Sequence, residues 1–295
     1  MVIIITGTSS GIGYATAETL ARNGHTVYAT MRDPQRSPQL QQLVDEEKLD
    51  LHILQLDVLD DQSVQKAVNA VLEKERRIDV LVNNAGIHNW GAVEEMPMEF
   101  FKDNMETNFF GALRCIKAVL PSMRENRSGI IINISSIAGE LYSNFHGAYS
   151  PSKAALEALS ESLAQEVAPY NVKVFIVQPG ITKTPILNKV NKIPANTNYP
   201  NIKRFLSMFA ASLGDNPISP AFAADIINDI VSEKRNTMRN PAGPDATVLL
   251  GFRASMTDED WAKSVMIDDA TWITAMEQMG MGVGKYMQAE GLPQF

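Results

Sequence analysis

Short apolar runs alternate with amphipathic segments along most of this 295-residue chain. The apolar runs occupy residues 2–5, 26–30, 51–56, 78–82, 130–135 and 172–177. Each run is continuous rather than alternating in polarity, which is the pattern of parallel strands that helices bury on both faces. The sequence therefore predicts an α/β fold with a doubly wound, mainly parallel sheet.

The segments between the runs have helical periodicity. One apolar stripe consists of Val64, Ala67, Val68, Val71 and Leu72. It follows Asp60 and Asp61, which are candidate N-caps. Ser219 and Pro220 supply a cap and a first-turn proline for another helix, which we expect to run to about Lys234. No repeat or linker divides the first 235 residues.

The last part of the chain has a different pattern. Residues 236–251 are rich in turn formers, and Pro241 allows at most an edge strand there. Residues 257–260 resemble a helix start with acids in the first turn. We expect one dinucleotide-binding and catalytic domain over residues 1–250, with two short helices packed on it in a C-terminal extension over residues 251–295.

Composition narrows the function. The net charge of −8 argues against nucleic acid, because phosphate backbones are bound by clustered Lys and Arg. Cys115 is the only cysteine and lies in an apolar helical pattern, so we expect a core residue in a reducing compartment. Residues 1–5 are too short for a signal sequence, and no apolar window is long enough to span a membrane. We predict a cytoplasmic protein with a small-molecule partner.

A glycine-rich loop follows the first predicted strand. It contains Gly7, Ser9, Ser10, Gly11, Ile12 and Gly13, and it opens an amphipathic helix that Gly24 ends. Glycines at such a turn permit close backbone approach, so amides and the helix dipole can hold a pyrophosphate. The spacing Gly-x3-Gly-x-Gly departs from the usual dinucleotide fingerprint, and a plain tight turn is the alternative.

A second constellation carries acid–base chemistry. Tyr149 and Lys153 lie four residues apart at the start of a helix, where Pro151 fits only the first turn. A nearby ammonium favours the phenolate, so we expect the pKa of the tyrosine to be lowered toward operating pH. Ser136 ends the strand upstream and is placed to hydrogen-bond a substrate oxygen, whereas we expect Ser135 to bond backbone.

With these motifs the chain resembles the short-chain dehydrogenase/reductase family over about residues 1–235. The likeness also includes Asn83-Asn84-Ala85-Gly86 and Asn108. It implies seven strands in the order 3-2-1-4-5-6-7. It also implies catalysis by Ser136, Tyr149, Lys153 and Asn108, the last through a water that relays protons. Lys153 would also hold the nicotinamide ribose.

The resemblance extends to the cofactor. It implies that Asn84, Ala85 and Gly86 border the adenosine side and that Asp57 and Val58 contact adenine. The segment Pro179-Gly180-Ile181-Thr182-Lys183-Thr184 resembles the family's segment beside nicotinamide, with contacts from Pro179, Gly180, Thr182 and Thr184. A packing role is the alternative for Asn108. Pro151 and the last 45 or so residues depart from the family's shorter members.

Cofactor choice depends on the end of the second strand. Met31 stands where the family's NAD enzymes usually carry an acid, and Arg32 offers a planar cation suited to a 2′-phosphate. Ser9 adds a hydroxyl donor. Asp33 is the competing feature, but it precedes Pro34, so we expect a loop or capping role. NADP(H) is favoured and NAD(H) stays possible.

The predicted activity is hydride transfer between nicotinamide and a carbonyl or secondary alcohol. A non-catalytic NADP(H) sensor and a nucleotide-sugar epimerase or dehydratase are the alternatives. The four histidines, His25, His52, His88 and His146, are scattered without metal-ligand spacing, so we expect no metal. We expect His88 and His146 to be solvent-exposed or bonded to backbone.

The substrate should lie between the loop after Gly86, the segment 137–148 and the segment at about 185–215. The predicted contacts are Trp90, Leu141, Tyr142, Phe145, Ile186, Leu187, Phe205, Met208 and Phe209. They suggest a bulky hydrophobic substrate. Lys183, Lys189, Lys192, Lys203 and Arg204 in this region fit a solvated face better than an anion site.

The resemblance implies an oligomer. Helices at about 101–120 and 150–168 pair across a twofold in this family, so we expect a homodimer or, less readily, a homotetramer. The Met-rich tail is expected to cover either an oligomer surface or the active site.

Overall fold

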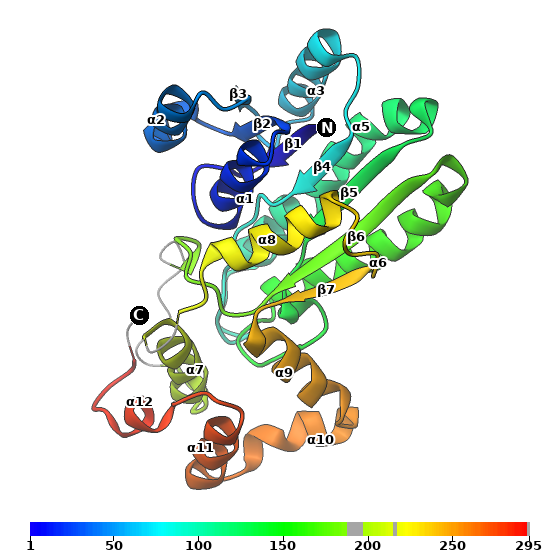
Figure 1. The fold of residues 1–295 in the computed structure, drawn as a ribbon. Coiled ribbons are helices and arrows are strands. Elements are labelled where there is room, and N and C mark those ends of the chain that lie inside the picture. The colour runs from blue at the N-terminus through cyan, green and yellow to red at the C-terminus, as the bar shows by residue number, and fades with distance from the viewer. Residues whose placement is uncertain (188–196, 215–216, 294–295) are drawn as a thin grey trace.

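The computed structural model describes residues 1–187, 197–214 and 217–293. Seven strands form one sheet in the order β3-β2-β1-β4-β5-β6-β7, as predicted, and all six neighbouring pairs are parallel (Figure 1). The strands are β1 (Val2–Thr6), β2 (Thr26–Met31), β3 (Leu51–Gln55), β4 (Val80–Asn83), β5 (Gly129–Ile134), β6 (Val172–Pro179) and β7 (Arg239–Ala242).

The strand order reverses beside β1, which pairs with β2 on one side and with β4 on the other. In a doubly wound sheet this is the point where a ligand crevice opens beyond the carboxyl ends of the strands. Ile3, Ile4 and Ile5 in β1 are at most 1% exposed. The continuous apolar run at the start of the chain is therefore the central strand.

Helices cover both faces of the sheet. The helices before the tail are α1 (Gly11–Arg22), α2 (Pro38–Glu47), α3 (Asp61–Glu75), α4 (Met98–Met105), α5 (Gly111–Asn126), α6 (Tyr149–Val167), α7 (Ile202–Gly214) and α8 (Pro220–Val231), of which α7 lies beyond one end of the sheet. Short 3-10 turns are η1 (Pro34–Arg36), η3 (Ile137–Gly139) and η4 (Ala168–Tyr170), and η2 (Glu106–Phe110) is a π-helical turn.

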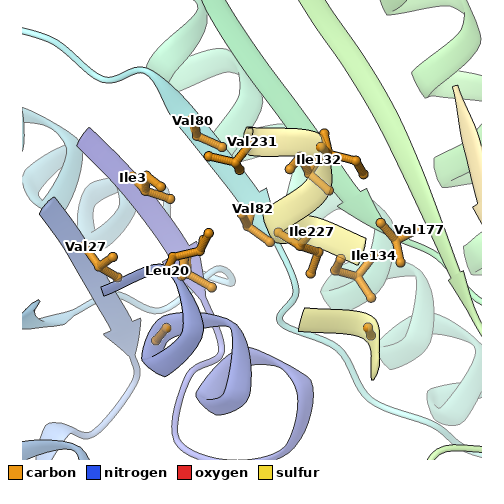
Figure 2. Close-up of a cluster of buried hydrophobic side chains, with 14 of the residues drawn as sticks. Ile3, Leu20, Val27, Val80, Val82, Ile132, Ile134, Val177, Ile227 and Val231 are labelled. Carbon is orange, nitrogen blue, oxygen red and sulfur yellow. The ribbon is translucent and has the colours of Figure 1, made fainter. Parts of the chain in front are cut away.

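Two apolar cores lie on the two faces. Leu20 of α1 and Ile227 of α8 pack on β-strand residues such as Ile3 and Val82 on one face (Figure 2). On the other face, α3, α5 and α6 pack against the sheet, and Cys115 is buried there as predicted, 1% exposed. Burying the sheet on both sides explains why its central strands have mostly apolar side chains on both faces.

Of the predicted caps, Asp60 and Ser219 are confirmed, whereas Asp61 is the first residue of α3. Asp60 accepts a hydrogen bond from the Gln62 amide at 2.8 Å, and Ser219 accepts one from the Ala221 amide at 3.2 Å. Such side-chain oxygens satisfy amides that the first turn leaves without partners. Helix α8 ends at Val231, three residues before the predicted Lys234.

The tail contains more structure than its sequence suggested. Its helices are α9 (Pro244–Ala254), α10 (Asp258–Lys263), α11 (Asp269–Gln278) and α12 (Gly284–Gln288), with a 3-10 turn η6 (Ser264–Met266). The prediction of two helices was wrong: α10, α11 and α12 all lie within residues 251–295, and Pro244, in a segment expected to form turns, stands in the first turn of α9. Strand β7 is at the edge, as Pro241 requires. Residue 250 lies inside α9, and the division of domains there stays a prediction.

The tail gathers beside α7 at one end of the molecule (Figure 1). Trp272, Met276 and Met281 are buried in a cluster with Leu141 and Ala211. The tail therefore packs against α7 and the segment that follows η3.

Basic side chains of α7 hold this tail. Arg204 donates to Asp269 at 2.7 Å and to the Ile267 carbonyl at 2.7 Å, and Lys203 donates to the Ala289 carbonyl at 2.7 Å. The expectation of a solvated face is wrong for these two residues. Lys183 is exposed, and Lys189 and Lys192 lie outside the described residues. Among the described helices, none combines the length and apolarity needed to cross a membrane.

Candidate active site

A cavity of about 480 Å³ opens at the carboxyl edge of the sheet. Its walls come from the loops after six strands, β1 to β6, and from α6 and α7. All but two of the predicted site residues line this cavity. They are Gly7, Ser9, Ser10, Gly11, Ile12, Arg32, Asp57, Val58, Asn84, Ala85, Gly86, Ser136, Tyr149, Lys153, Pro179, Gly180, Thr182 and Thr184. Gly13 and Asn108 are the two that lie behind this wall.

The glycine loop leaves no room for side chains. A Cβ on Gly7 would lie 2.7 Å from Ala85 Cα, and Gly7 has a φ of +71°. A Cβ on Gly13 would lie 2.4 Å from both Asn84 Nδ2 and the Gly7 carbonyl oxygen. The amide of Asn84 in turn donates to the Thr6 and Gly7 carbonyls at 2.9 and 3.0 Å. This braced loop at the start of a twelve-residue helix fits a pyrophosphate.

The candidate phosphate contact lies at the end of β2, the strand that pairs with β1 beside the glycine loop. Arg32 is exposed and lines the cavity together with Ser9, while Met31 is buried. Asp33 caps η1 by accepting from the Gln35 amide at 3.1 Å, which is the local role predicted for it. Asp57 accepts from the Leu59 amide at 3.1 Å and shapes the neighbouring turn.

Ser136, Tyr149 and Lys153 converge on the middle of the cavity. Lys153 Nζ lies 5.8 Å from the centroid of the Tyr149 ring and donates to the Ile134 carbonyl at 2.8 Å. Ser136 hydrogen-bonds the phenol of Tyr149 and lies at the end of β5, so the strand end and the first turn of α6 bring the three side chains together.

The protonation states of this group differ from the sequence-based expectation. Burial raises the pKa of Tyr149 to about 12, and the hydrogen bond from Ser136 lowers it only in part. Burial lowers the pKa of Lys153 to about 8, while the charge of Glu157 raises it in part. The expected lowering of the tyrosine pKa is thus wrong for the chain's own residues, since desolvation of the phenol outweighs the effect of Ser136. A neutral phenol is the form that donates a proton.

Asn108 lies in the π-helical turn η2 and is 1% exposed. Its side-chain oxygen accepts from the Ile87 amide at 2.8 Å, and its amide donates to the Ile87 carbonyl and to Ser152 Oγ at 3.0 and 2.9 Å. Ser152 Oγ donates to the Tyr149 carbonyl at 2.7 Å. Asn108 therefore ties the loop after β4 to the first turn of α6, the packing alternative named for it.

Comparisons with known proteins agree with this geometry. Residues 1–195 match the short chain dehydrogenase family. The chain belongs to the short-chain dehydrogenase/reductase family. This confirms the predicted family and fold. It also confirms the predicted enzyme class, a dehydrogenase/reductase acting on CH–OH or C=O groups. Members of the family use nicotinamide cofactors.

Three proteins illustrate the likeness. A 3-ketodihydrosphingosine reductase of Bacteroides thetaiotaomicron is 45% identical over 61% of this chain, and the match spans 63% of that reductase. Retinol dehydrogenase 8 of Bos taurus is 33% identical over 85% of this chain and 84% of its own length. The crystal structure of a short-chain dehydrogenase from Streptomyces avermitilis is 35% identical, with a TM-score of 0.74 over 95% of this chain and 97% of the other.

Ser135 makes a contact that the family motifs did not predict. Its hydroxyl donates to Glu157 Oε1 at 2.7 Å rather than to backbone. Glu157 is 3% exposed and also accepts from Gln178 at 3.1 Å and from Arg239 at 2.9 Å. The expectation for Ser135 was wrong because the carboxylate comes from α6, one turn beyond Lys153, and fills the space above Gly139.

His88 and His146 are buried in the cavity wall, 7% and 8% exposed, and not solvent-exposed as expected. The ring centroid of His88 lies 4.1 Å from that of Tyr149 and 5.0 Å from that of His146. His146 Nδ1 lies 2.9 Å from Ser143 Oγ. Their positions just after Gly86 and just before Tyr149 were the available signal, since both segments were expected to border the substrate.

The substrate side of the cavity is apolar. Of the predicted contacts, Leu141, Ile186, Leu187, Phe205, Met208 and Phe209 line it. Trp90 and Phe145 are buried behind this layer against Phe205, and Tyr142 is 51% exposed outside it. Leu249 of the tail helix α9 joins the wall, which sequence reasoning missed.

Proposed function

We propose that this protein is an NADPH-dependent carbonyl reductase for a bulky apolar ketone, with Tyr149 as the proton donor. The observation that carries the proposal is one continuous cavity with three parts: a glycine loop with Arg32, the Ser136–Tyr149–Lys153 group, and a wall of aromatic and aliphatic side chains. The names of two relatives, for 3-ketodihydrosphingosine and for retinol, support a substrate with a long hydrocarbon part.

The chemistry assigns one task to each side chain. Bound NADPH supplies the hydride that forms the new C–H bond at the carbonyl carbon. Tyr149 gives its phenolic proton to the carbonyl oxygen, so that the C=O double bond becomes an alcohol. Ser136 donates a hydrogen bond to the same oxygen as charge develops on it. Lys153, next to the phenol, stabilises the phenolate that remains until a proton returns from solvent.

The preference for NADPH rests on the residues at the adenosine end. Arg32 is exposed on the cavity wall and presents the cation that a 2′-phosphate requires, and Ser9 lies on the same wall. Asp33, the residue that would favour NAD, has its carboxylate engaged at the start of η1. NAD(H) remains the weaker cofactor in this proposal.

We further propose a homodimer in a reducing, cytoplasmic setting. The family pairing of α5 and α6 across a twofold supports the dimer, and the single buried thiol of Cys115 supports the setting. Light scattering at micromolar concentration tests the first part. A monomer there contradicts it.

One assay tests the catalytic proposal. The purified protein is incubated with NADPH or NADH and a panel of aliphatic, aryl and polycyclic ketones, and cofactor oxidation is followed by absorbance. We expect turnover with NADPH, fastest for the bulkier apolar ketones. NADPH binding without turnover of any ketone or alcohol indicates a cofactor sensor, and cofactor that stays bound and unoxidised while a nucleotide sugar reacts indicates an epimerase or dehydratase.

A further inference from the structure

Two imidazoles with unused hydrogen-bonding atoms lie beside the reacting group. His88 and His146 both line the cavity, and Nε2 of each is buried without a hydrogen-bond partner within the described residues. Both rings contact Tyr149, with centroids at 4.1 and 5.9 Å. A buried polar atom without a hydrogen-bond partner is destabilising, so two neighbouring ones in a substrate cavity indicate a ligand group that satisfies them.

The surroundings exclude several kinds of ligand. The rings that pack around the two histidines are Trp90, Phe205 and Phe209, which offer no acceptor to Nε2 at these positions. In the described ranges of the chain, no third His, Cys, Asp or Glu joins them in a group that could hold a metal. These surroundings do not favour a resident metal ion, which leaves a water molecule or an atom of the substrate as the partner.

The protonation state of His88 and His146 narrows the chemical group that they can bind. Burial lowers the pKa of His146 to about 4, and burial together with His146 and Lys153 lowers the pKa of His88 well below its ordinary value. Both rings are neutral near pH 7, and a neutral imidazole has one N–H donor and one acceptor nitrogen. A carboxylate only accepts and an ammonium only donates, whereas a hydroxyl does both and can satisfy one ring as acceptor and the other as donor.

We propose that His88 and His146 form a recognition site for a hydroxyl group carried by the substrate within a few carbons of the reacting carbonyl. The substrate class is then an apolar hydroxyketone. This inference rests on the proposed function, because the hydroxyl is located relative to a carbonyl bound at Tyr149. It adds a polar specificity site to a pocket whose other substrate-facing side chains are mainly apolar.

Matched substrates test the inference. The first is a decanone with its carbonyl on the third carbon, the second carries an added hydroxyl on the first carbon, and the third has that hydroxyl methylated. Two neutral hydrogen bonds correspond to a kcat/KM for the hydroxyketone about 10- to 100-fold above that of the plain ketone. The methyl ether can accept a hydrogen bond but cannot donate one. The logarithm of its kcat/KM relative to the plain ketone should therefore be at most about half of that for the hydroxyketone.

Variants connect the preference to the two rings. His88→Phe and His146→Phe keep an aromatic ring against Tyr149 but remove the polar atoms, so the hydroxyketone to ketone ratio should fall toward one in each. His146→Gln restores an amide near the position of Nε2 and should recover part of the ratio. His52→Phe, on β3 and outside the cavity lining, is the matched control and should keep the wild-type ratio.

The outcomes separate the two proposals. Turnover of the plain ketone with a wild-type ratio near one overturns the hydroxyl site and leaves the reductase standing, and a water then satisfies the two rings. A high wild-type ratio that survives both Phe variants also overturns the site, because the hydroxyl is then recognised elsewhere. No turnover of any of the three ketones with either cofactor overturns both proposals.

Discussion

The imidazole of His88 lies against the phenol ring of Tyr149, with the ring centroids 4.1 Å apart and the ring planes inclined by 37°. His88 comes from the loop after β4, and Tyr149 begins α6. Asn108 holds these same two segments together through Ile87 and Ser152. The position of the phenol is thus fixed by packing from the side and by hydrogen bonds beneath it, which leaves its hydroxyl as the part that can be removed without disturbing the site.

Tyr149→Phe therefore tests the proton donor. The variant keeps the ring that packs on His88 and deletes only the hydroxyl. We expect kcat to fall by about 100- to 10,000-fold, the usual contribution of a positioned acid, and NADPH affinity to stay within about threefold. Ketone-dependent NADPH oxidation gives the first number and titration calorimetry the second. A kcat within about tenfold of the wild type would remove Tyr149 from the mechanism.

Gly13→Ala tests the cofactor loop. The added Cβ would meet Asn84 Nδ2 and the Gly7 carbonyl oxygen at 2.4 Å, so the brace that shapes the loop must move. We expect NADPH to bind at least about tenfold more weakly, a change of about 1.4 kcal/mol. Calorimetry measures the affinity and circular dichroism the melting temperature.

Gly251→Ala is the matched control for that change. Gly251 lies in α9, is exposed and would have no atom within 4 Å of its Cβ. Alanine favours a helix by up to about 1 kcal/mol over glycine, so this variant should be slightly more stable and bind NADPH normally. Equal affinities in the two variants would contradict the steric role of Gly13.

The buried histidines predict acid sensitivity. The pKa of His146 is lowered from 6.5 to about 4 by burial, so the folded protein holds the ring neutral while the unfolded chain protonates it. The unfolded state then binds more protons, and stability is lost as pH falls from about 6.5 to about 4. His88, which faces the same ring, acts in the same direction.

Urea denaturation at about pH 7 and about pH 4 measures this effect. The shift for His146 corresponds to about 3 kcal/mol between the two pH values. In His146→Phe the loss of unfolding free energy over this interval should be smaller by about that amount. Identical losses in wild type and variant would show that His146 titrates as it does in water.

Arg239 is expected to hold a carboxylate inside the fold. It lies 2.9 Å from buried Glu157 and 2.6 Å from Glu140, and it donates to Glu161. Removing it leaves Glu157 buried with like charges nearby. We expect Arg239→Ala to lose about 2 to 3 kcal/mol of unfolding free energy, below the upper range for a fully buried pair because the arginine is 35% exposed.

Arg235→Ala is the corresponding control. Arg235 pairs with Asp229 at 3.5 Å on the surface, and such pairs contribute less than about 1 kcal/mol. Urea denaturation of both variants at neutral pH gives the comparison. Equal losses of unfolding free energy in the two variants would mean that Arg239 does not stabilise the buried carboxylate of Glu157.

The sequence was sufficient where local pattern decides structure. The order of strands followed from continuous apolar runs and the family motifs, and Asp60, Ser219 and Asp33 were identified as caps because their oxygens act on amides two residues away. The same local reasoning identified the glycine loop.

Local pattern was insufficient where contacts join distant segments. Nothing adjacent to Ser135 indicates Glu157, 22 residues away, and nothing adjacent to His88 indicates that His146 and Tyr149 would enclose it. The predicted pKa of Tyr149 was wrong for a related reason: the Tyr-x3-Lys spacing shows that Lys153 is near but not that the phenol is buried, and burial raises its pKa. The predicted structure of the tail was wrong because a proline can either end or begin a helix. Which of the two it does depends on how the tail packs beside α7.

The last prediction concerns cofactor preference at Arg32. Its guanidinium is exposed on the cavity wall, and a charge-assisted contact to a 2′-phosphate contributes about 1.5 to 3 kcal/mol. Arg32→Ala should therefore weaken NADPH about 10- to 150-fold and change NADH little, because NADH lacks that phosphate. Arg124→Ala, an exposed arginine of α5 outside the cavity lining, should change neither affinity. Kd values for both cofactors from fluorescence or calorimetric titration, and kcat/KM from the ketone assay, provide the measurement. A wild type with higher kcat/KM for NADH, or an Arg32→Ala that weakens both cofactors equally, would assign the adenosine end to NAD instead.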